Sequence, residues 1–138
     1  MSQENVEIVR QAWDAWIRGD LRGALRNWHP EVVLDMSHWR DWPEAEYLGL
    51  ERVELFMNEW RDMWDDYEAG VEDVIAAPDG RVVSLYWHRG TGRDSRLPME
   101  FRGAQVTSLR SGKVTRVAYY DDRAEALQAV ELTASNLP

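Results

Sequence analysis

Hydrophobic residues recur at helical spacing in two long segments of the chain. In the first, the apolar residues share one helical face: Val6, Val9, Trp13 and Trp16. In the second they repeat in the same way: Leu50, Val53, Phe56, Trp60, Met63 and Trp64. Between these segments, Asp20 can cap a short helix that stops before Pro30, because proline disfavours helix in the residue before it. The pattern therefore predicts three helices in the first half.

Short apolar runs separated by turn residues occupy the rest of the chain. Strands are expected at residues 31–36, 67–77, 81–89, 97–109 and 114–120. Two of the separating turns are Pro78-Asp79-Gly80 and Ser111-Gly112-Lys113, which are typical of hairpins. Asp122 has the spacing of a cap for a short terminal helix. Residues 37–48 show no period, and we interpret them as a loop over a pocket mouth.

The order of these elements predicts one α+β domain over residues 1–138. Helices and strands are segregated, which favours an antiparallel sheet with the helices on one face. A chain of this length can bury a hydrophobic core without disulfides or metals.

The strand at residues 82–88 is apolar on both faces. One face carries Val83, Leu85 and Trp87, and the other carries Val82, Ser84, Tyr86 and His88. Three helices can cover only one face of a curved sheet. A second subunit is the simplest cover for the face with Trp87, so we expect a homodimer formed through the sheet.

Composition and charge narrow the classes of partner. The net charge of −9 argues against nucleic acid, whose phosphates require a basic surface. The chain has no cysteine, no apolar run of the ~20 residues needed to span a membrane, and no signal-peptide pattern. We therefore expect a cytoplasmic protein without membrane contact. Eight Trp residues suit the walls of a cavity for ring-shaped ligands, although most Trp residues in any protein are simply core.

Asp35 is the first candidate for chemistry, because it closes an apolar strand just before the irregular segment. Its neighbours Val33 and Leu34 are apolar, and burial would raise the pKa of its carboxyl toward that of a general base. The alternative is a solvated aspartate that caps a turn.

His88 and Tyr86 are the second candidates, since they lie two apart on one strand and project from the same face. The imidazole could relay a proton, and the phenol could donate to a developing oxyanion. Tyr119 and Tyr120 lie on opposite faces of the last strand, so one of them should point inward. We take Tyr119 as the inward one. The alternative for each is a structural role.

Several further residues are expected to line a substrate-binding pocket: Trp13, Trp16, Trp39, Phe56, Trp60 and Gln105. A single β-bulge near Gln105 would reverse its direction. We predict no metal site, because the chain has no His-x-x-x-His pair and no dense carboxylate cluster.

Several local motifs occur together in a familiar order. They are Arg18-Gly19-Asp20-Leu21, Trp28-His29-Pro30-Glu31-Val32 leading to Asp35, Asp79 to Val83, Ser111 to Val114, and Tyr119 to Leu127. In this order the chain resembles the SnoaL-like (polyketide cyclase-type) branch of the nuclear transport factor 2-like superfamily. The resemblance implies a cone-shaped, strongly curved mixed or antiparallel sheet wrapped around the N-terminal and central helices. It also implies one apolar pocket, a dimer, and chemistry without cofactors.

The resemblance also bears on the reaction. Asp35 falls where ketosteroid isomerases of this superfamily carry their proton-abstracting Asp, but Ala12 replaces their oxyanion Tyr. Tyr86, His88 and Tyr119 replace the water-activating residues of the epoxide hydrolases. The expected protein binds an apolar small molecule. It is either a cofactor-free cyclase, isomerase or dehydratase acting on a cyclic carbonyl substrate, a non-catalytic ligand-binding protein, or a dimeric scaffold.

Overall fold

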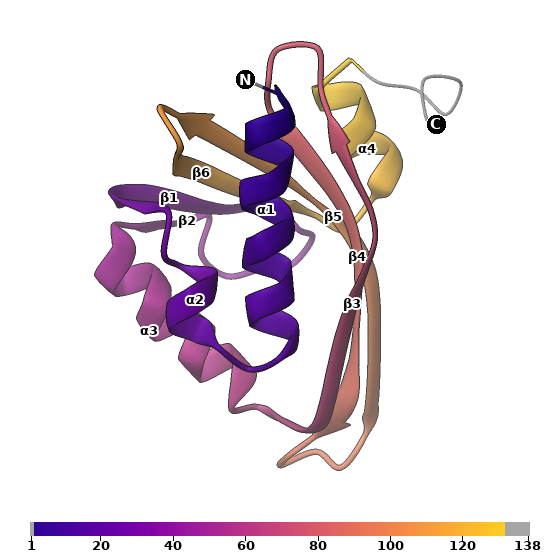
Figure 1. Cartoon of the computed structure of the whole chain (residues 1–138). Helices are drawn as coiled ribbons and strands as arrows, with labels where there is room; N and C mark the ends of the chain where they lie inside the picture. The colour runs from indigo at the N-terminus through magenta and orange to yellow at the C-terminus, as the bar shows by residue number, and fades with distance from the viewer. Residues whose placement is uncertain (1, 132–138) are drawn as a thin grey trace.

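The computed structural model describes residues 2–131 and shows an α+β fold built on one sheet (Figure 1). The helices are α1 (Ser2–Ile17), α2 (Leu21–Ala24), α3 (Leu50–Arg61) and α4 (Arg123–Ala129). The strands are β1 (Trp28–His38), β2 (Glu46–Leu48), β3 (Trp64–Ala76), β4 (Val82–Gly92), β5 (Pro98–Arg110) and β6 (Lys113–Tyr120). The sheet has the order β2-β1-β6-β5-β4-β3, with β1 parallel to β6 and its other described pairings antiparallel.

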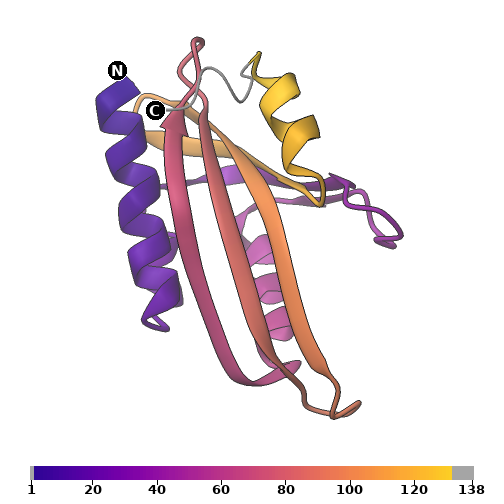
Figure 2. The same cartoon turned by 90° about the vertical axis from the view of Figure 1, so that its right-hand side faces the viewer.

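The sheet is strongly curved, and its long strands β3, β4 and β5 bend along their length (Figure 2). Helices α1 and α3 lie on the inner side of the curve, whereas α4 lies on the outer side (Figures 1 and 2). The predicted fold class, with a curved mixed sheet around the N-terminal and central helices, is confirmed.

The inner core forms where α1 packs on β4. Val9 and Trp13 of the helix contact Val82 and Tyr86 of the strand in one buried cluster. A second cluster joins α3 to β1 through residues such as Val53. The predicted inner face of β4 is therefore confirmed.

Helix α4 covers part of the outer face, which the sequence assigned to a partner subunit. Ala126 and Val130 pack on Val83 and Ala104 of the sheet in a buried cluster. The helix starts where predicted, because the carboxylate of Asp122 accepts hydrogen bonds from the first backbone N–H groups. The short C-terminal helix therefore covers part of the face that was expected to need a second subunit.

The Trp87 side chain, also on the outer face, packs against residues of its own sheet. Its indole lies over Gly70 of β3, where an added Cβ would sit 2.6 Å from the ring. The guanidinium of Arg89 lies 5.0 Å from the indole centroid. Parts of the outer face are therefore covered within one chain, whereas Leu85 and Trp87 are only half-buried, and the homodimer stays a prediction.

Several element boundaries differ from the sequence expectation. Helix α3 ends at Arg61, so Met63 and Trp64 lie outside it, and Trp64 begins β3 instead of residue 67. Strand β1 extends from Trp28 to His38 because β2 and β6 flank it on both sides and satisfy its backbone groups. Pro30 is accommodated within β1 where the pairing with β6 shifts register between Trp28 and Val33. Part of the expected loop, Glu46–Leu48, is the edge strand β2.

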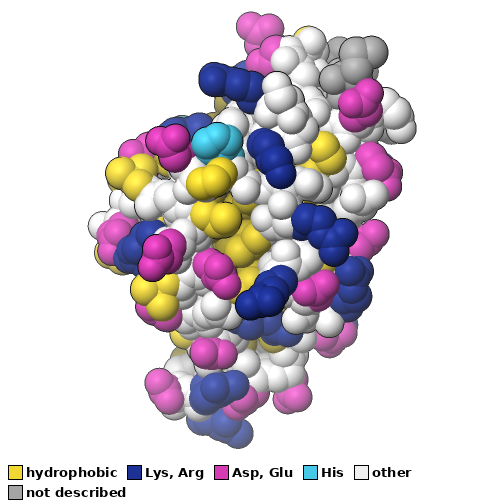
Figure 3. Space-filling view, turned by 60° about the vertical axis from the view of Figure 1, so that its left-hand side comes forward, with side chains coloured by type: hydrophobic (Ala, Val, Ile, Leu, Met, Phe, Trp, Pro, Cys, Tyr) yellow, Lys and Arg dark blue, Asp and Glu magenta, His cyan; other side chains and the backbone are white. Residues whose placement is uncertain are grey.

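The face shown in Figure 3 groups hydrophobic side chains in its middle, with charged side chains around them. The exposed apolar residues of the chain include Leu48 on β2 and Leu55 on α3, both more than half exposed. Among the helices of residues 2–131, none is long and apolar enough to cross a membrane.

Candidate functional site

A cavity of about 110 Å³ lies inside the curve of the sheet, between α1, α3 and the inner faces of β4, β5 and β6. Its walls are mainly aromatic: Trp13, Trp16, Trp28, Trp39, Trp42, Phe56, Trp60, Tyr86, Phe101 and Tyr119. The remaining lining residues are small or apolar, apart from His88, Gln105 and Thr107. Helix α1 contributes one face of this cavity through the same periodicity that builds the core.

The structure brings nine of the ten predicted site residues to this cavity. They are Trp13, Trp16, Trp39, Phe56, Trp60, Tyr86, His88, Gln105 and Tyr119. Of the two tyrosines at the end of β6, Tyr119 is the inward one, and Tyr120 belongs to the cluster under α4. Their catalytic and binding roles stay predictions.

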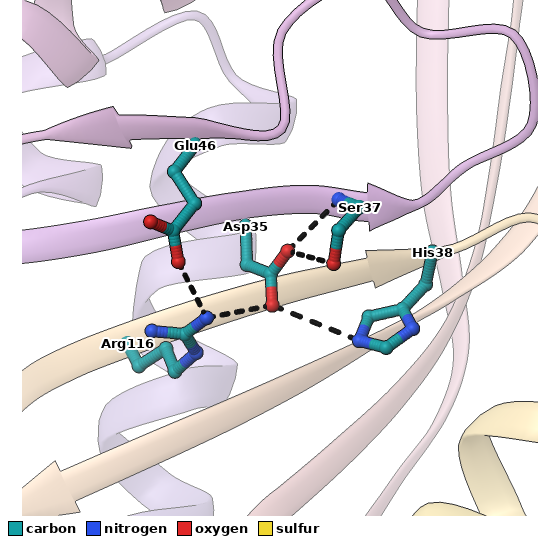
Figure 4. A network of polar contacts seen from close by, with 5 residues as sticks. All are labelled: Asp35, Ser37, His38, Glu46 and Arg116. Atoms are coloured by element: carbon teal, nitrogen blue, oxygen red, sulfur yellow. Dashed lines mark hydrogen bonds and ion pairs between the residues drawn. The ribbon is translucent and has the colours of Figure 1, made fainter.

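Asp35 is the exception, and the expectation that it faces the pocket is wrong. The alternation of β1 directs Leu34 and Met36 into the inner core, so Asp35 lies on the outer face (Figure 4). Residues 32, 33, 34 and 36 are all apolar, so the sequence did not decide whether the even-numbered or the odd-numbered residues of this strand face the core. Val33 is the residue that takes the outward phase with Asp35.

The carboxylate of Asp35 is buried in a polar cluster with Ser37 and Arg116 (Figure 4). It accepts from the Ser37 backbone N–H at 2.8 Å and the Ser37 hydroxyl at 2.6 Å. Arg116 donates to its other oxygen at 2.8 Å and to Glu46 at 2.9 Å. Burial alone would raise the pKa of Asp35, but these donors together lower it below its ordinary value. The carboxylate is a stable anion that joins β2, β1 and β6.

No charged side chain lines the aromatic cavity, as far as the described residues show. The polar groups in its lining are uncharged: they are the side chains of Gln105, Thr107 and the tyrosines, together with His88, whose burial keeps it neutral. Two short hydrogen-bonded chains end at these groups. The donors set the direction of the chain through Gln105, whereas the direction of the last contact in the chain through Tyr67 depends on the tautomer of His88. Within residues 2–131, no group of three His, Asp or Glu side chains could hold a metal ion.

The first chain runs from Thr107 through Gln105 to Tyr119. The Thr107 hydroxyl donates to the Gln105 amide oxygen at 3.2 Å, and the Gln105 amide N–H donates to the Tyr119 hydroxyl at 3.1 Å. Burial raises the pKa of Tyr119 to about 12, so the phenol keeps its proton at neutral pH. Because its oxygen already accepts from Gln105, the Tyr119 O–H remains available as a donor.

The second chain runs from Trp16 through Tyr67 to His88. The Trp16 indole N–H donates to the Tyr67 hydroxyl at 2.8 Å, and the Tyr67 oxygen lies 2.5 Å from His88 Nδ1. Burial, with a smaller contribution from the Arg61 charge, lowers the pKa of His88 to about 3. The imidazole is therefore neutral at physiological pH.

Tyr86 stands between the ends of the two chains. Its ring stacks on Trp13 at 5.3 Å and meets Tyr119 edge-on at 6.0 Å. Burial raises the pKa of Tyr86 well above its ordinary value. An added Cβ at Gly103 would come within 2.9 Å of the Tyr86 hydroxyl, so the glycine makes room for the phenol. The Trp13 indole N–H is buried and has no acceptor among the described residues.

The sequence interpretation missed Tyr67 and Thr107. Thr107 lies two residues after Gln105 on β5, so the strand period could have identified it as a second inward polar group. Tyr67 gave no such signal, because its contact with His88 depends on the pairing of β3 with β4 across 21 residues.

The curved sheet wrapped around α1 and α3 has the nuclear transport factor 2-like fold. Residues 9–117 match the sequence profile of the SnoaL-like domain, which is more than half of the chain. The chain therefore belongs to the SnoaL-like domain family, and the resemblance read from its motifs is confirmed. Among curated proteins, no sequence matches this chain.

Solved structures share the fold at low sequence identity. A nuclear transport factor 2-like protein of unknown function from Burkholderia pseudomallei K96243 is 19% identical, with TM-score 0.73 over 92% of this chain and 97% of that one. A protein named as a SnoaL-like polyketide cyclase from Jannaschia sp. CCS1 is 19% identical, with TM-score 0.74 over 99% and 94%. A protein with a ketosteroid isomerase-like fold from Catenulispora acidiphila DSM 44928, in complex with trimethylamine, is 17% identical, with TM-score 0.69 over 96% and 98%.

Proposed function

We propose that this protein binds a small, neutral, ring-shaped compound in the aromatic cavity through an acceptor oxygen such as a carbonyl. One observation carries the proposal. The cavity lining holds no charged side chain in the described structure, and the Tyr119 hydroxyl at its wall accepts from Gln105, so its O–H is left to donate to a ligand. Donors without competing acceptors favour a ligand that supplies the acceptor.

The dimensions of the cavity favour a single ring. Drug-sized ligands need about 300 Å³ or more, whereas a dry apolar cavity of about 150 Å³ in another protein holds benzene. A volume of about 110 Å³ suits a compact ring rather than a steroid. The aromatic side chains leave this space open, so the structure supports a binding role better than a scaffold with a filled cone.

The donors could also polarise a carbonyl, but the site offers no clear general base. Asp35 lies on the outer face, and His88 is a very weak base because burial lowers its pKa to about 3. The geometry therefore favours the non-catalytic binding protein over the acid–base cyclase, isomerase or dehydratase that was expected with Asp35 as its base.

A second candidate ligand is a small organic cation. Faces of Trp and Tyr attract ammonium groups, and aromatic side chains make up most of this cavity wall. The structural relative from Catenulispora acidiphila in complex with trimethylamine adds to this candidate. The Tyr119 O–H weighs against it, since a hydrogen-bond donor repels an ammonium N–H at that point of the cavity wall.

Three probe compounds separate these candidates in titrations followed by NMR. They are cyclohexanone, methylenecyclohexane, in which CH2 replaces the carbonyl oxygen, and trimethylammonium. We expect cyclohexanone to bind roughly tenfold tighter than methylenecyclohexane, the effect of one to two net hydrogen bonds. Equal binding of the two ring compounds would refute the role of the donors. Preferential binding of trimethylammonium would select the cation.

A matched pair of variants locates the binding group. Tyr119→Phe removes the phenol at the cavity, whereas Tyr120→Phe removes the adjacent phenol, which packs under α4 on the outer face. The first should abolish most of the preference for cyclohexanone over methylenecyclohexane, and the second should preserve it.

A further inference from the structure

Tyr67 is absent from the lining of the cavity, yet it contacts the one histidine that lines it. A neutral imidazole has two tautomers, and each gives the cavity a different group at Nε2. With the proton on Nε2 the ring donates to a ligand, and with the proton on Nδ1 the ring accepts from one. The partner of Nδ1 therefore decides which ligands His88 can bind.

We propose that Tyr67, held by Trp16, is a positioning residue that fixes His88 as a hydrogen-bond donor and so makes the cavity select acceptor ligands over donor ligands. The inference rests on the proposed function for the ligand itself. It adds to that function a residue outside the cavity that sets its specificity.

The number of protons shared by Trp16, Tyr67 and His88 decides which group donates in the contact between Tyr67 and His88. The Tyr67 oxygen accepts from the Trp16 N–H at 2.8 Å, so its own proton must go to another acceptor. His88 Nδ1 at 2.5 Å is the acceptor that the described structure provides. If Nδ1 instead carried the proton, two N–H groups would point at one oxygen and the buried Tyr67 hydroxyl proton would lack a partner. A buried hydroxyl without an acceptor is unfavourable, so the proton of the His88 imidazole lies on Nε2.

The surroundings of His88 keep it neutral, which leaves the tautomer as its one variable. Trp60 lies 4.9 Å and Trp13 6.4 Å from the imidazole centroid. The nearby charge is the guanidinium of Arg61, which lies 4.1 Å from the ring centroid of Tyr67 and disfavours a second cation. No carboxylate of the described chain forms an ion pair with His88.

Nitrogen-15 NMR reads the tautomer without any ligand. The chain has three histidines, so the imidazole signals can be assigned with a His88→Gln spectrum as reference. We expect His88 in the wild-type protein at pH 7 to show a protonated Nε2 and an unprotonated Nδ1. A protonated Nδ1, or equal populations of the two tautomers, would overturn the inference whether or not a ligand is found.

Removal of the Tyr67 hydroxyl should release the tautomer. In Tyr67→Phe we expect both His88 tautomers to be populated, because Nδ1 loses its donor. The matched control is Tyr47→Phe, since the Tyr47 hydroxyl also accepts from an indole N–H, that of Trp42 at 3.1 Å, but has no contact with His88. This control should keep the wild-type tautomer. A Tyr67→Phe spectrum identical to wild type would show that Tyr67 does not set the proton position.

Ligand preference gives the second readout. Cyclopentanone has an acceptor only and pyrrole has an N–H donor only, on rings of equal size. Wild-type protein should prefer cyclopentanone, and Tyr67→Phe should reduce that preference by roughly tenfold, the effect of reversing one hydrogen bond. An unchanged preference in a folded Tyr67→Phe protein would overturn the inference. If neither probe binds to wild type but Nε2 is protonated, the proposed function fails and the assignment of the tautomer stands.

Discussion

Replacement of Asp35 by Asn tests whether this carboxylate holds the sheet together or serves a ligand. Only 4% of the residue is exposed, and its oxygens accept three hydrogen bonds, two from Ser37 and one from Arg116. The amide of Asn keeps the shape of the side chain but removes the charge. It also turns an NH2 group toward donors that need an acceptor.

The cost follows from these contacts. Hydrogen bonds to a charged group contribute about 1.5–3 kcal/mol each, against about 0.5–1.5 kcal/mol for neutral ones, so each weakened bond loses roughly 1 kcal/mol. The share of Arg116 is smaller, because its side chain is 42% exposed and also pairs with Glu46. We expect a total loss of about 2 kcal/mol and a fall in Tm of roughly 5–10 °C.

Thermal unfolding and cyclohexanone titration of the same protein sample make the test. Asp14→Asn, at an exposed site on α1, is the control and should stay within about 0.5 kcal/mol of wild type. Asp35→Asn should lose stability while its affinity for cyclohexanone stays within roughly twofold. A tenfold loss of affinity with unchanged Tm would refute our placement of Asp35 away from the ligand.

The other predictions concern the cavity, the pH response and the outer face. Tyr119→Phe should weaken cyclohexanone binding roughly tenfold in an NMR titration, with Tyr120→Phe unchanged, because the lost donor is worth about one hydrogen bond. The pKa of His88 is about 3 in the folded protein against 6.5 for an ordinary histidine, so the unfolded chain binds a proton that the folded chain does not. Stability should therefore fall as the pH is lowered from 6.5 toward 3, by about 2 kcal/mol at pH 5, in urea unfolding series. His88→Gln should remove that slope, and a slope equal to wild type would show that another group causes it. Gly70→Ala should cost about 1–2 kcal/mol in the same assay, because the new methyl group would displace the Trp87 indole, and an unchanged stability would contradict the packing described for that face.

Periodicity in the sequence predicted the parts of the fold that depend on one segment at a time. The helical faces of α1 and α3 follow from the repeats of Trp13 and Trp60, and the two faces of β4 follow from simple alternation. Gln105 and Tyr119 face the cavity as predicted, and they pair with each other in the regular part of the β5–β6 ladder, because its register shift lies at Ser108 and Leu109.

The sequence did not predict features that depend on contacts between two segments, or on which face of a strand a given residue occupies. Apolar residues on both sides of Asp35 left the phase of β1 undecided, and packing against α3 chose it. Tyr67 reaches His88 only through the register of β3 on β4. The sequence predicted the terminal helix but not its position on the outer face, where its buried residue Ala126 packs against the sheet.

A crystal structure of the protein grown with cyclohexanone tests the central claim most directly. Our account predicts the ring inside the aromatic cavity, with its carbonyl oxygen within hydrogen-bonding distance of Tyr119 Oη or His88 Nε2. A ring bound beside Asp35 on the outer face, or one in the cavity with its oxygen directed away from both donors, would contradict it.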